Sequence, residues 1–157
     1  MKKSKNISIC FAASSGGHFE QLMMLKPLMI KYPNSFIVTE KTSYRIQSEI
    51  KAYEILQLNR KQLLFVFLLI INTFHSLFLI VKNKPDYIIC TGVLSMIPIC
   101  LIGKIFGAKL IYIESFAKIN SPTLTGRFLY RFANQFYVQW ESMKKFFPDA
   151  IFLGGIY

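Results

Sequence analysis

The chain has 157 residues, of which 53% are apolar, and its 19 lysines and arginines outnumber eight acidic residues to give a formal charge of +11. This length is enough for one domain with a sizeable core. The charge favours a polyanionic partner, either nucleic acid or an anionic membrane surface. Because the sequence has no zinc-ligand spacing and no nucleic-acid-binding motif, its apolar content favours the membrane, and we expect no nucleic acid partner. The alternative, that the charge only keeps an apolar domain soluble, stays open here.

Three cysteines, Cys10, Cys90 and Cys100, lie inside apolar runs. An odd number at such positions is typical of small core residues in a reducing compartment, so we expect neither a disulfide framework nor a metal site. The first apolar run is short and lacks a convincing cleavage site, so we expect no signal peptide.

The first apolar stretch leads into a turn of small residues and then into a helix. Residues 7–13 are typical of a buried strand, residues 14–17 are Ser-Ser-Gly-Gly, and a helical pattern begins at His18. Paired glycines let the backbone approach a ligand, and the free N–H groups of a first helical turn attract anions. The imidazole of His18 can act as a base near neutral pH. The alternative is an ordinary strand-to-helix turn with an incidental histidine.

Further along, strand-like and helix-like segments alternate. Pro27 should kink or shorten the first helix, and Gly107 should end a later one. Ser121 followed by Pro122 has the form of an N-cap with proline in the first turn. Because the central strands are apolar on both faces, we expect an α/β fold: one Rossmann-like domain over residues 1–157, with a parallel sheet flanked by helices. The expected strands after the first are 36–39, 53–58, 86–91, 109–113, 135–139 and 150–153, and the expected helices include 43–52, 94–106, 121–133 and 142–147.

Polar side chains follow three of the expected strands. In an open parallel sheet, ligands bind beyond the carboxyl ends of the strands, so these groups should share one edge. Glu114 could orient His18 or bind a sugar hydroxyl, or it could only cap the helix that follows. We take His18 and Glu114 as candidate catalytic residues, and as candidate binding residues Ser14, Ser15, Gly16, Gly17, Thr91, Gly92, Ser95 and Ser115.

Residues 62–81 carry no formal charge and are flanked by lysine and arginine at both ends. Their length is near the minimum for crossing a bilayer. Because the segment lies between two strands, we interpret it as a crossover helix with one side on the sheet and an exposed remainder in the headgroup boundary. A fully buried helix and a transmembrane helix are the alternatives. On a helical wheel, one arc is wholly apolar (Leu63, Phe67, Ile70, Ile71, Phe74, Phe78 and Val81), while Gln62, Asn72, Thr73, His75 and Ser76 cluster on the other side.

Arg127 and Arg131 lie four positions apart on the helix expected after Ser121, so they should share a face. That face could bind a phosphate or the carboxylates of a partner. A solvated basic face explains the same spacing.

Two stretches together resemble the acceptor-side subunit of split GT-B glycosyltransferases. Residues 11–22 read FAASSGGHFEQL, and residues 91–140 read TGVLSMIPICLIGKIFGAKLIYIESFAKINSPTLTGRFLYRFANQFYVQW. The similar proteins are bacterial capsule and exopolysaccharide subunits, the membrane-recruiting subunit of the UDP-N-acetylglucosamine transferase of dolichol-linked glycan assembly and, more distantly, the N-terminal half of lipid II synthase. The resemblance covers nearly the whole chain, and the motifs in this order are more specific than any one alone.

The resemblance implies the N-terminal half of a GT-B enzyme, acting as one subunit of an inverting, UDP-sugar-dependent glycosyltransferase. A donor-binding partner subunit would hold the UDP-sugar, so this chain would bind no cofactor alone and would be inactive or weakly active without the partner. The chain would dock that partner at the cytoplasmic face of the cell membrane, as a peripheral or monotopic protein in capsular or exopolysaccharide synthesis. It would also present a lipid-pyrophosphate-linked sugar acceptor. The length agrees with one half of such an enzyme, with a linker expected to begin near Gly154 and Gly155.

The resemblance also suggests residue roles. Gly16, Gly17 and His18 match the family's acceptor loop, with the histidine as candidate base, and Glu114 matches a carboxylate after the central strand. Lys118 stands where many relatives have arginine, which would loosen a bidentate phosphate grip. The acceptor would meet the binding residues named above; Lys118, Arg127 and Arg131 are candidate phosphate or partner contacts, and Leu63, Phe67, Ile70, Phe74 and Phe78 are candidate membrane contacts.

Two other classes of function stay open. A non-catalytic scaffold would only recruit and activate the donor-side enzyme. A stand-alone nucleotide-binding enzyme would need a Gly-x-Gly-x-x-Gly turn and an acidic residue at the end of the next strand; Glu40 lies near that place, but SSGGH matches the turn poorly.

Overall fold

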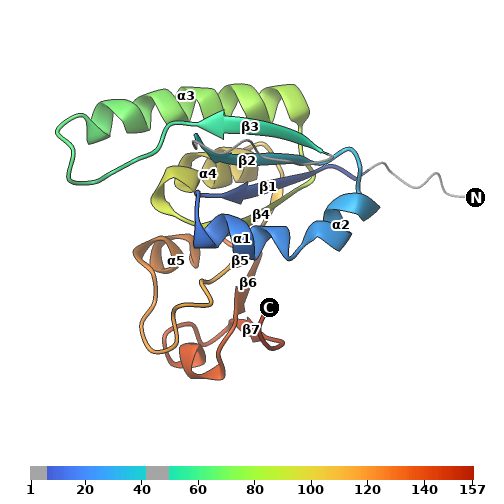
Figure 1. Cartoon of the computed structure of the whole chain (residues 1–157), viewed down its shortest axis with the longest axis vertical. Coiled ribbons are helices and arrows are strands. Elements are labelled where there is room, and N and C mark those ends of the chain that lie inside the picture. The colour runs from blue at the N-terminus through green and yellow to red at the C-terminus, as the bar shows by residue number, and fades with distance from the viewer. Residues whose placement is uncertain (1–6, 42–49) are drawn as a thin grey trace, which may run out of the picture.

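The computed structural model describes residues 7–41 and 50–157. Within them, seven strands form one sheet in the order β3-β2-β1-β4-β5-β6-β7, and every neighbouring pair is parallel (Figure 1). The chain moves outward from β1 to β3, crosses back to β4 and then moves outward to β7, which puts the switch point of the sheet between β1 and β4. The expected Rossmann-like α/β fold is confirmed. The strands are β1 (Ile9–Ala13), β2 (Phe36–Glu40), β3 (Lys51–Ile55), β4 (Tyr87–Gly92), β5 (Lys109–Ile113), β6 (Gln135–Val138) and β7 (Ile151–Phe152).

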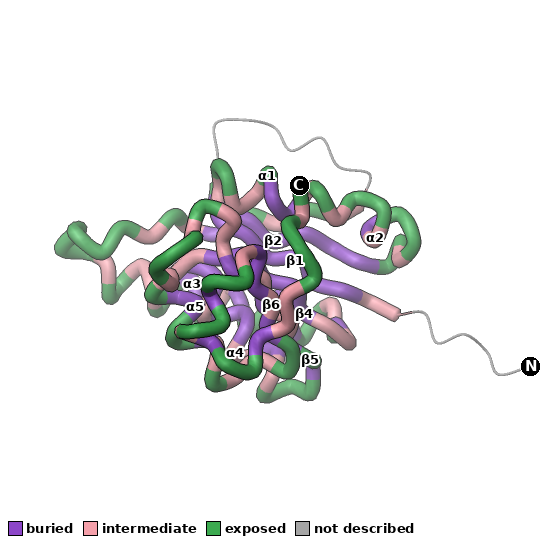
Figure 2. Tube along the Cα trace, turned by 90° about the horizontal axis from the view of Figure 1, so that it is seen from below, coloured by how far each residue is buried: buried purple, intermediate pink, exposed green. Residues whose placement is uncertain are grey.

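Helices cover both faces of the sheet, and the strands run through the buried interior (Figure 2). Because successive side chains of a strand point to opposite faces of the sheet, β1 contributes residues to the hydrophobic cluster on each face. Phe11 meets Leu22 of α1 on one face, while Cys10 and Ala12 lie in the larger cluster on the other. α1 (Gly17–Met23) and α2 (Lys26–Lys31) lie on the first face; α3 (Phe65–Asn83), α4 (Ile97–Ile105) and α5 (Leu124–Leu129) lie on the second, with 3₁₀ turns at Leu94–Met96 and Glu141–Lys145.

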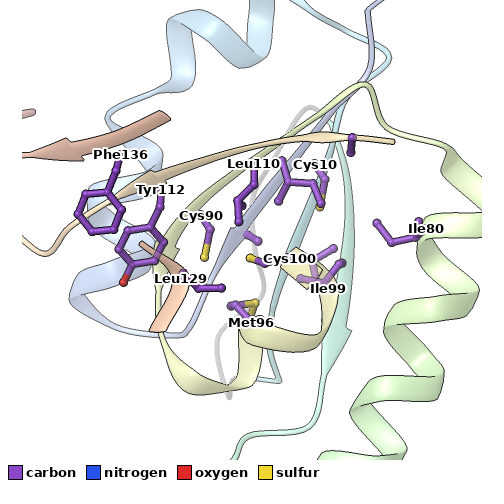
Figure 3. Close-up of a cluster of buried hydrophobic side chains, with 14 of the residues drawn as sticks. Cys10, Ile80, Cys90, Met96, Ile99, Cys100, Leu110, Tyr112, Leu129 and Phe136 are labelled. Atoms are coloured by element: carbon purple, nitrogen blue, oxygen red, sulfur yellow. The ribbon is translucent and has the colours of Figure 1, made fainter. Parts of the chain in front are cut away.

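The larger core cluster contains all three cysteines as buried, free thiols (Figure 3). Burial raises the pKa of the Cys10 thiol, and a hydrogen bond with Cys90 together with burial raises that of Cys100. Such thiols are unreactive core residues, so the interpretation of the cysteines as core residues is confirmed. The fully buried Tyr112 stacks on Phe136 with ring centroids 5.0 Å apart.

Two predicted elements around β3 differ from the structure. Of the helix predicted over 43–52, residues 43–49 lie outside the described residues, and Lys51 and Ala52 belong to β3, where they pair in register with β2. The strand predicted over 53–58 ends at Ile55. It ends there because the side chain of Asn72 takes over both backbone groups of Leu56, accepting from its N–H at 3.0 Å and donating to its carbonyl at 2.7 Å.

The helix after β5 begins later and is shorter than predicted. Its N-cap is Thr123, not Ser121, because the Thr123 hydroxyl accepts the N–H of Gly126 at 2.8 Å. The helix ends at Leu129, so Arg131 lies beyond it and the expected helical face shared with Arg127 does not form. The effect of Pro27 is confirmed: α1 ends at Met23, and the proline lies in the first turn of α2.

α3 packs its mixed side inward and exposes its apolar arc. Asn72 and Ser76 are fully buried, whereas Phe67 and Phe74 are 60% and 68% exposed. The helix has the length and apolar composition needed to cross a membrane. Only 22% of its most apolar 18-residue stretch is buried inside the protein. The alternative of a fully buried helix is therefore wrong.

α4 lies against β4 through Gly103, where a Cβ atom would overlap Cδ1 of the buried Ile88. We expect Gly103→Ala to lower the free energy of unfolding by about 1–3 kcal/mol, because overpacking outweighs the better helix propensity of alanine. Urea denaturation followed by circular dichroism measures this change. Gly17→Ala is the matched control, since a Cβ there meets open space. Equal midpoints for the two variants would contradict this packing.

Candidate functional site

His18 lies at the start of α1, at the carboxyl edge of the sheet, and two hydrogen bonds tie it to the end of β4. Its Nδ1 is 2.6 Å from the carbonyl oxygen of Thr91, and the Thr91 hydroxyl donates to the His18 carbonyl at 2.8 Å. A carbonyl oxygen can only accept, so Nδ1 must carry the proton. The neutral ring therefore has its lone pair on Nε2, which is the form that a general base requires.

Gly92 is the residue against which the imidazole lies. Its φ is 112°, and a Cβ atom there would lie 3.1 Å from Cε1 and Nδ1 of His18. The carbonyl of Gly92 also accepts the N–H of Ser14 at 2.8 Å. Glycine at this position thus satisfies the backbone conformation and the space for the ring at once.

Glu114 follows β5 and is fully buried. Its Oε1 accepts the N–H of Ser115 at 2.9 Å, and its Oε2 accepts the hydroxyl of Thr123 at 3.0 Å. Gly126 of α5 faces the carboxylate so closely that a Cβ atom would overlap Oε2. Burial raises the pKa of Glu114, although these hydrogen bonds and the charge of His18 oppose the rise. The ring of His18 is oriented by the hydrogen bond that its Nδ1–H donates to the Thr91 carbonyl, and the interaction of Glu114 with His18 is electrostatic.

Two buried glutamines complete the site, and sequence reasoning missed both. Gln21 of α1 donates to the Glu114 carbonyl at 3.3 Å and accepts the N–H of Phe116 at 3.2 Å. Gln139, just after β6, donates to the same carbonyl at 2.8 Å. The loop after β5 is thereby fixed to α1 and to the end of β6. No local signal marks these residues, because their partners lie 93 and 25 positions away.

A cavity of about 340 Å³ opens beside His18. Phe116 forms one wall and packs on Trp140 and Tyr157, with ring centroids 5.0 Å apart in both pairs. The cavity offers an imidazole, a backbone rim and aromatic surface, which together suit a small polar ring such as a sugar. Its lining residues are Gly17, His18, Gln21, Ser115, Phe116, Ala117 and Tyr157.

The other predicted residues divide into buried supports and residues elsewhere. Thr91 and Ser95 are fully buried, so the expectation that they contact an acceptor is corrected; Thr91 instead holds His18. Ser14 is buried behind Gly92, and the half-buried Ser15 donates to Glu40 at 3.3 Å. Gly16 caps α1 with φ 78°. Lys118 lines a separate groove. Arg127 and Arg131 are exposed and line neither that groove nor the cavity beside His18.

The fold and this edge define a Rossmann-like domain with a histidine at the switch point of its parallel sheet. Residues 9–156 match the family described as oligosaccharide biosynthesis protein Alg14 like, and the chain belongs to this family. It is 25% identical to the human UDP-N-acetylglucosamine transferase subunit ALG14 over 97% of this chain and 84% of the human protein. To the rat subunit of the same name it is 31% identical over 75% of this chain, spanning 56% of that relative's length.

Solved structures share the fold at low identity. MurG of Acinetobacter baumannii superposes with a TM-score of 0.71 and 18% identity, over 87% of this chain and 42% of that one. A UDP-N-acetylglucosamine 2-epimerase of Rickettsia bellii gives a TM-score of 0.72 and 9% identity, over 96% and 45%. The chain thus spans less than half of these proteins, and the expected likeness to the N-terminal half of a GT-B enzyme is confirmed for the fold.

The buried carboxyl of Glu114 should make stability depend on pH. Because its pKa is raised in the folded state, Glu114 costs no stability below the unfolded pKa, and stability is lost as pH rises from there through the folded pKa. We expect the Glu114→Gln variant to lack the part of the loss of stability with rising pH that comes from Glu114. Urea unfolding from about pH 4 to about pH 8 should show the difference, wild type minus variant, decreasing with pH. Glu141→Gln, at an exposed site, is the control; a flat or increasing difference for Glu114→Gln would contradict the burial.

Proposed function

We propose that this chain is the acceptor-side subunit of a two-component, UDP-sugar-dependent inverting glycosyltransferase. A partner subunit would bind the UDP-sugar, and this chain would bind a lipid-pyrophosphate-linked acceptor and dock the partner at the cytoplasmic face of the cell membrane. Capsular or exopolysaccharide synthesis is the proposed setting. The observation that carries the proposal is the hydrogen bond that leaves Nε2 of the neutral His18 ring unprotonated beside a cavity of about 340 Å³, in a chain of the Alg14-like family.

The relatives' name supplies a second support. The human and rat proteins are called subunits of a UDP-N-acetylglucosamine transferase, which implies that a further chain completes the enzyme. Ligands of open α/β sheets bind at the edge where His18 lies, so a partner facing this edge would close the site.

The proposed chemistry is a direct displacement. The acceptor hydroxyl oxygen forms a bond to the anomeric carbon while the bond from that carbon to UDP breaks, and its electron pair leaves with UDP. The hydroxyl proton passes to Nε2 of His18. Thr91 supports the transfer because its carbonyl accepts from Nδ1, which keeps Nε2 free before the reaction and stabilises the imidazolium afterwards.

The charge of Glu114 contributes to the same step. When ionised, its carboxylate interacts favourably with a protonated His18. It cannot reach the acceptor, because it is fully buried and already bonded to Ser115 and Thr123. We therefore assign it the positioning of the loop after β5 and electrostatic support of the imidazolium.

We propose that α3 lies in the membrane interface and does not span the bilayer. Its two ends join β3 and β4 of one sheet, and Asn72 binds the backbone of Leu56 on the protein side. A spanning helix would have to leave these contacts. In the interface, its apolar arc would enter the headgroup boundary, and the flanking cations would meet anionic lipids.

His18→Ala is expected to lower kcat of the two-subunit complex by roughly a hundredfold to ten-thousandfold, because the proton acceptor is removed. Transfer from a panel of radiolabelled UDP-hexoses and UDP-N-acetylhexosamines to lipid extract of the source cells measures this. Size-exclusion chromatography should show the complex intact, and His75→Gln is the control. Unchanged turnover would favour a non-catalytic scaffold, and full activity of this chain alone would disprove a divided site.

Phe67→Ser with Phe74→Ser should weaken binding of the full chain to vesicles of phosphatidylglycerol and phosphatidylcholine by at least about tenfold, because two large apolar side chains no longer enter the interface. Vesicle co-sedimentation measures the change. Ile30→Ser is the matched control, since Ile30 of α2 is 59% exposed on the opposite layer. Equal binding of both variants would exclude α3 as the membrane contact.

A further inference from the structure

A groove of about 800 Å³ lies on the same edge of the sheet as the cavity beside His18. It runs between the loop that leads into α3 and the segment that leads into α5, both of which lie on the side toward which the strand arrows point (Figure 1). Three cations line it: Arg60 and Lys61 from the loop, and Lys118 from the segment after β5. Within the part of the chain that the structure describes, no acidic residue lines it. The groove therefore concentrates positive charge.

One end of the groove adjoins the histidine. Gly92 lies against the ring of His18, and the next residue, Val93, lines the groove. Thr123 also lines the groove and donates to the carboxylate of Glu114. Thr123 and the Gly92–Val93 segment thus adjoin both the groove and the candidate site.

The other end of the groove adjoins the apolar surface of α3. Leu63 and Leu64 come one residue after the two loop cations and are among the most exposed apolar side chains. Leu94 and Leu124 add apolar surface inside the groove itself. The order across this edge is therefore apolar surface, cationic groove and histidine base.

We propose that this groove binds the diphosphate of an isoprenyl-diphosphate-linked acceptor, with Arg60, Lys61 and Lys118 as its ligands. The inference rests on the proposed function for the nature of the acceptor. Such an acceptor has the same order of parts: an apolar tail, a diphosphate and a sugar. With the tail along α3 and the diphosphate in the groove, the sugar is directed past Gly92 toward His18. Cations that line a groove with no acidic residue among its described lining can bind a doubly charged diphosphate through charge-assisted hydrogen bonds.

Direct binding tests the groove with the full chain and soluble geranyl diphosphate, measured by isothermal titration calorimetry. We expect the triple variant Arg60→Gln, Lys61→Gln, Lys118→Gln to raise Kd on the order of a hundredfold, because three charge-assisted contacts are lost. The control triple Lys26→Gln, Lys51→Gln, Lys144→Gln removes the same charge from exposed positions off the groove and should change Kd by less than about twofold. Inorganic pyrophosphate should bind more weakly than geranyl diphosphate, since it lacks the tail.

Three outcomes would overturn the groove assignment: equal Kd values for the two triple variants, no binding of geranyl diphosphate by the wild type, or a loss confined to phosphatidylglycerol vesicles. The last would mark a surface for lipid headgroups. Turnover separates this inference from the proposed function. In the active complex, the groove variant should raise KM for the lipid acceptor with kcat retained at saturation. If the wild-type complex is active and the groove variant has an unchanged KM, the groove assignment alone is wrong. If the wild-type complex is inactive, the proposed function is wrong.

Discussion

The contact between the end of β4 and the start of α1 is the constraint on which this site depends. Thr91 and His18 exchange two hydrogen bonds, and the carbonyl of Gly92 holds the N–H of Ser14. These bonds join the two strands on either side of the switch point. The same contact fixes the imidazole, its tautomer and the glycine turn, so the geometry that the proposed base needs is set in one place.

Buried polar groups extend this constraint across the sheet. The carbonyl of Glu114 receives Gln21 and Gln139, while its carboxylate receives Ser115 and Thr123. A buried carboxylate is costly unless its oxygens are satisfied, and here each one accepts a hydrogen bond. Burial still raises the pKa of Glu114, because these hydrogen bonds offset the loss of solvation only in part. The loop after β5 is therefore held rigidly beside His18.

The sequence predicted the layers of the fold well, because apolar runs bounded by turn residues mark buried parallel strands. It predicted the edge at which His18, Gly92 and Glu114 gather for the same reason. It failed where a distant side chain decides the outcome. Asn72 ends β3 by binding the backbone of Leu56, and Thr123 displaces the expected cap because it also bonds to Glu114. The burial of Thr91 and Ser95 likewise depends on packing that the sequence pattern does not contain.

The tautomer of His18 tests the central claim most directly. The chain has two histidines, so long-range ¹⁵N–¹H correlation spectra of the ring nitrogens can be assigned by comparison with His75→Gln. The hydrogen bond to Thr91 predicts that the neutral ring carries its proton on Nδ1 and leaves Nε2 unprotonated. A neutral ring protonated on Nε2 would contradict the account, because the nitrogen proposed to receive the acceptor's proton would then have no lone pair.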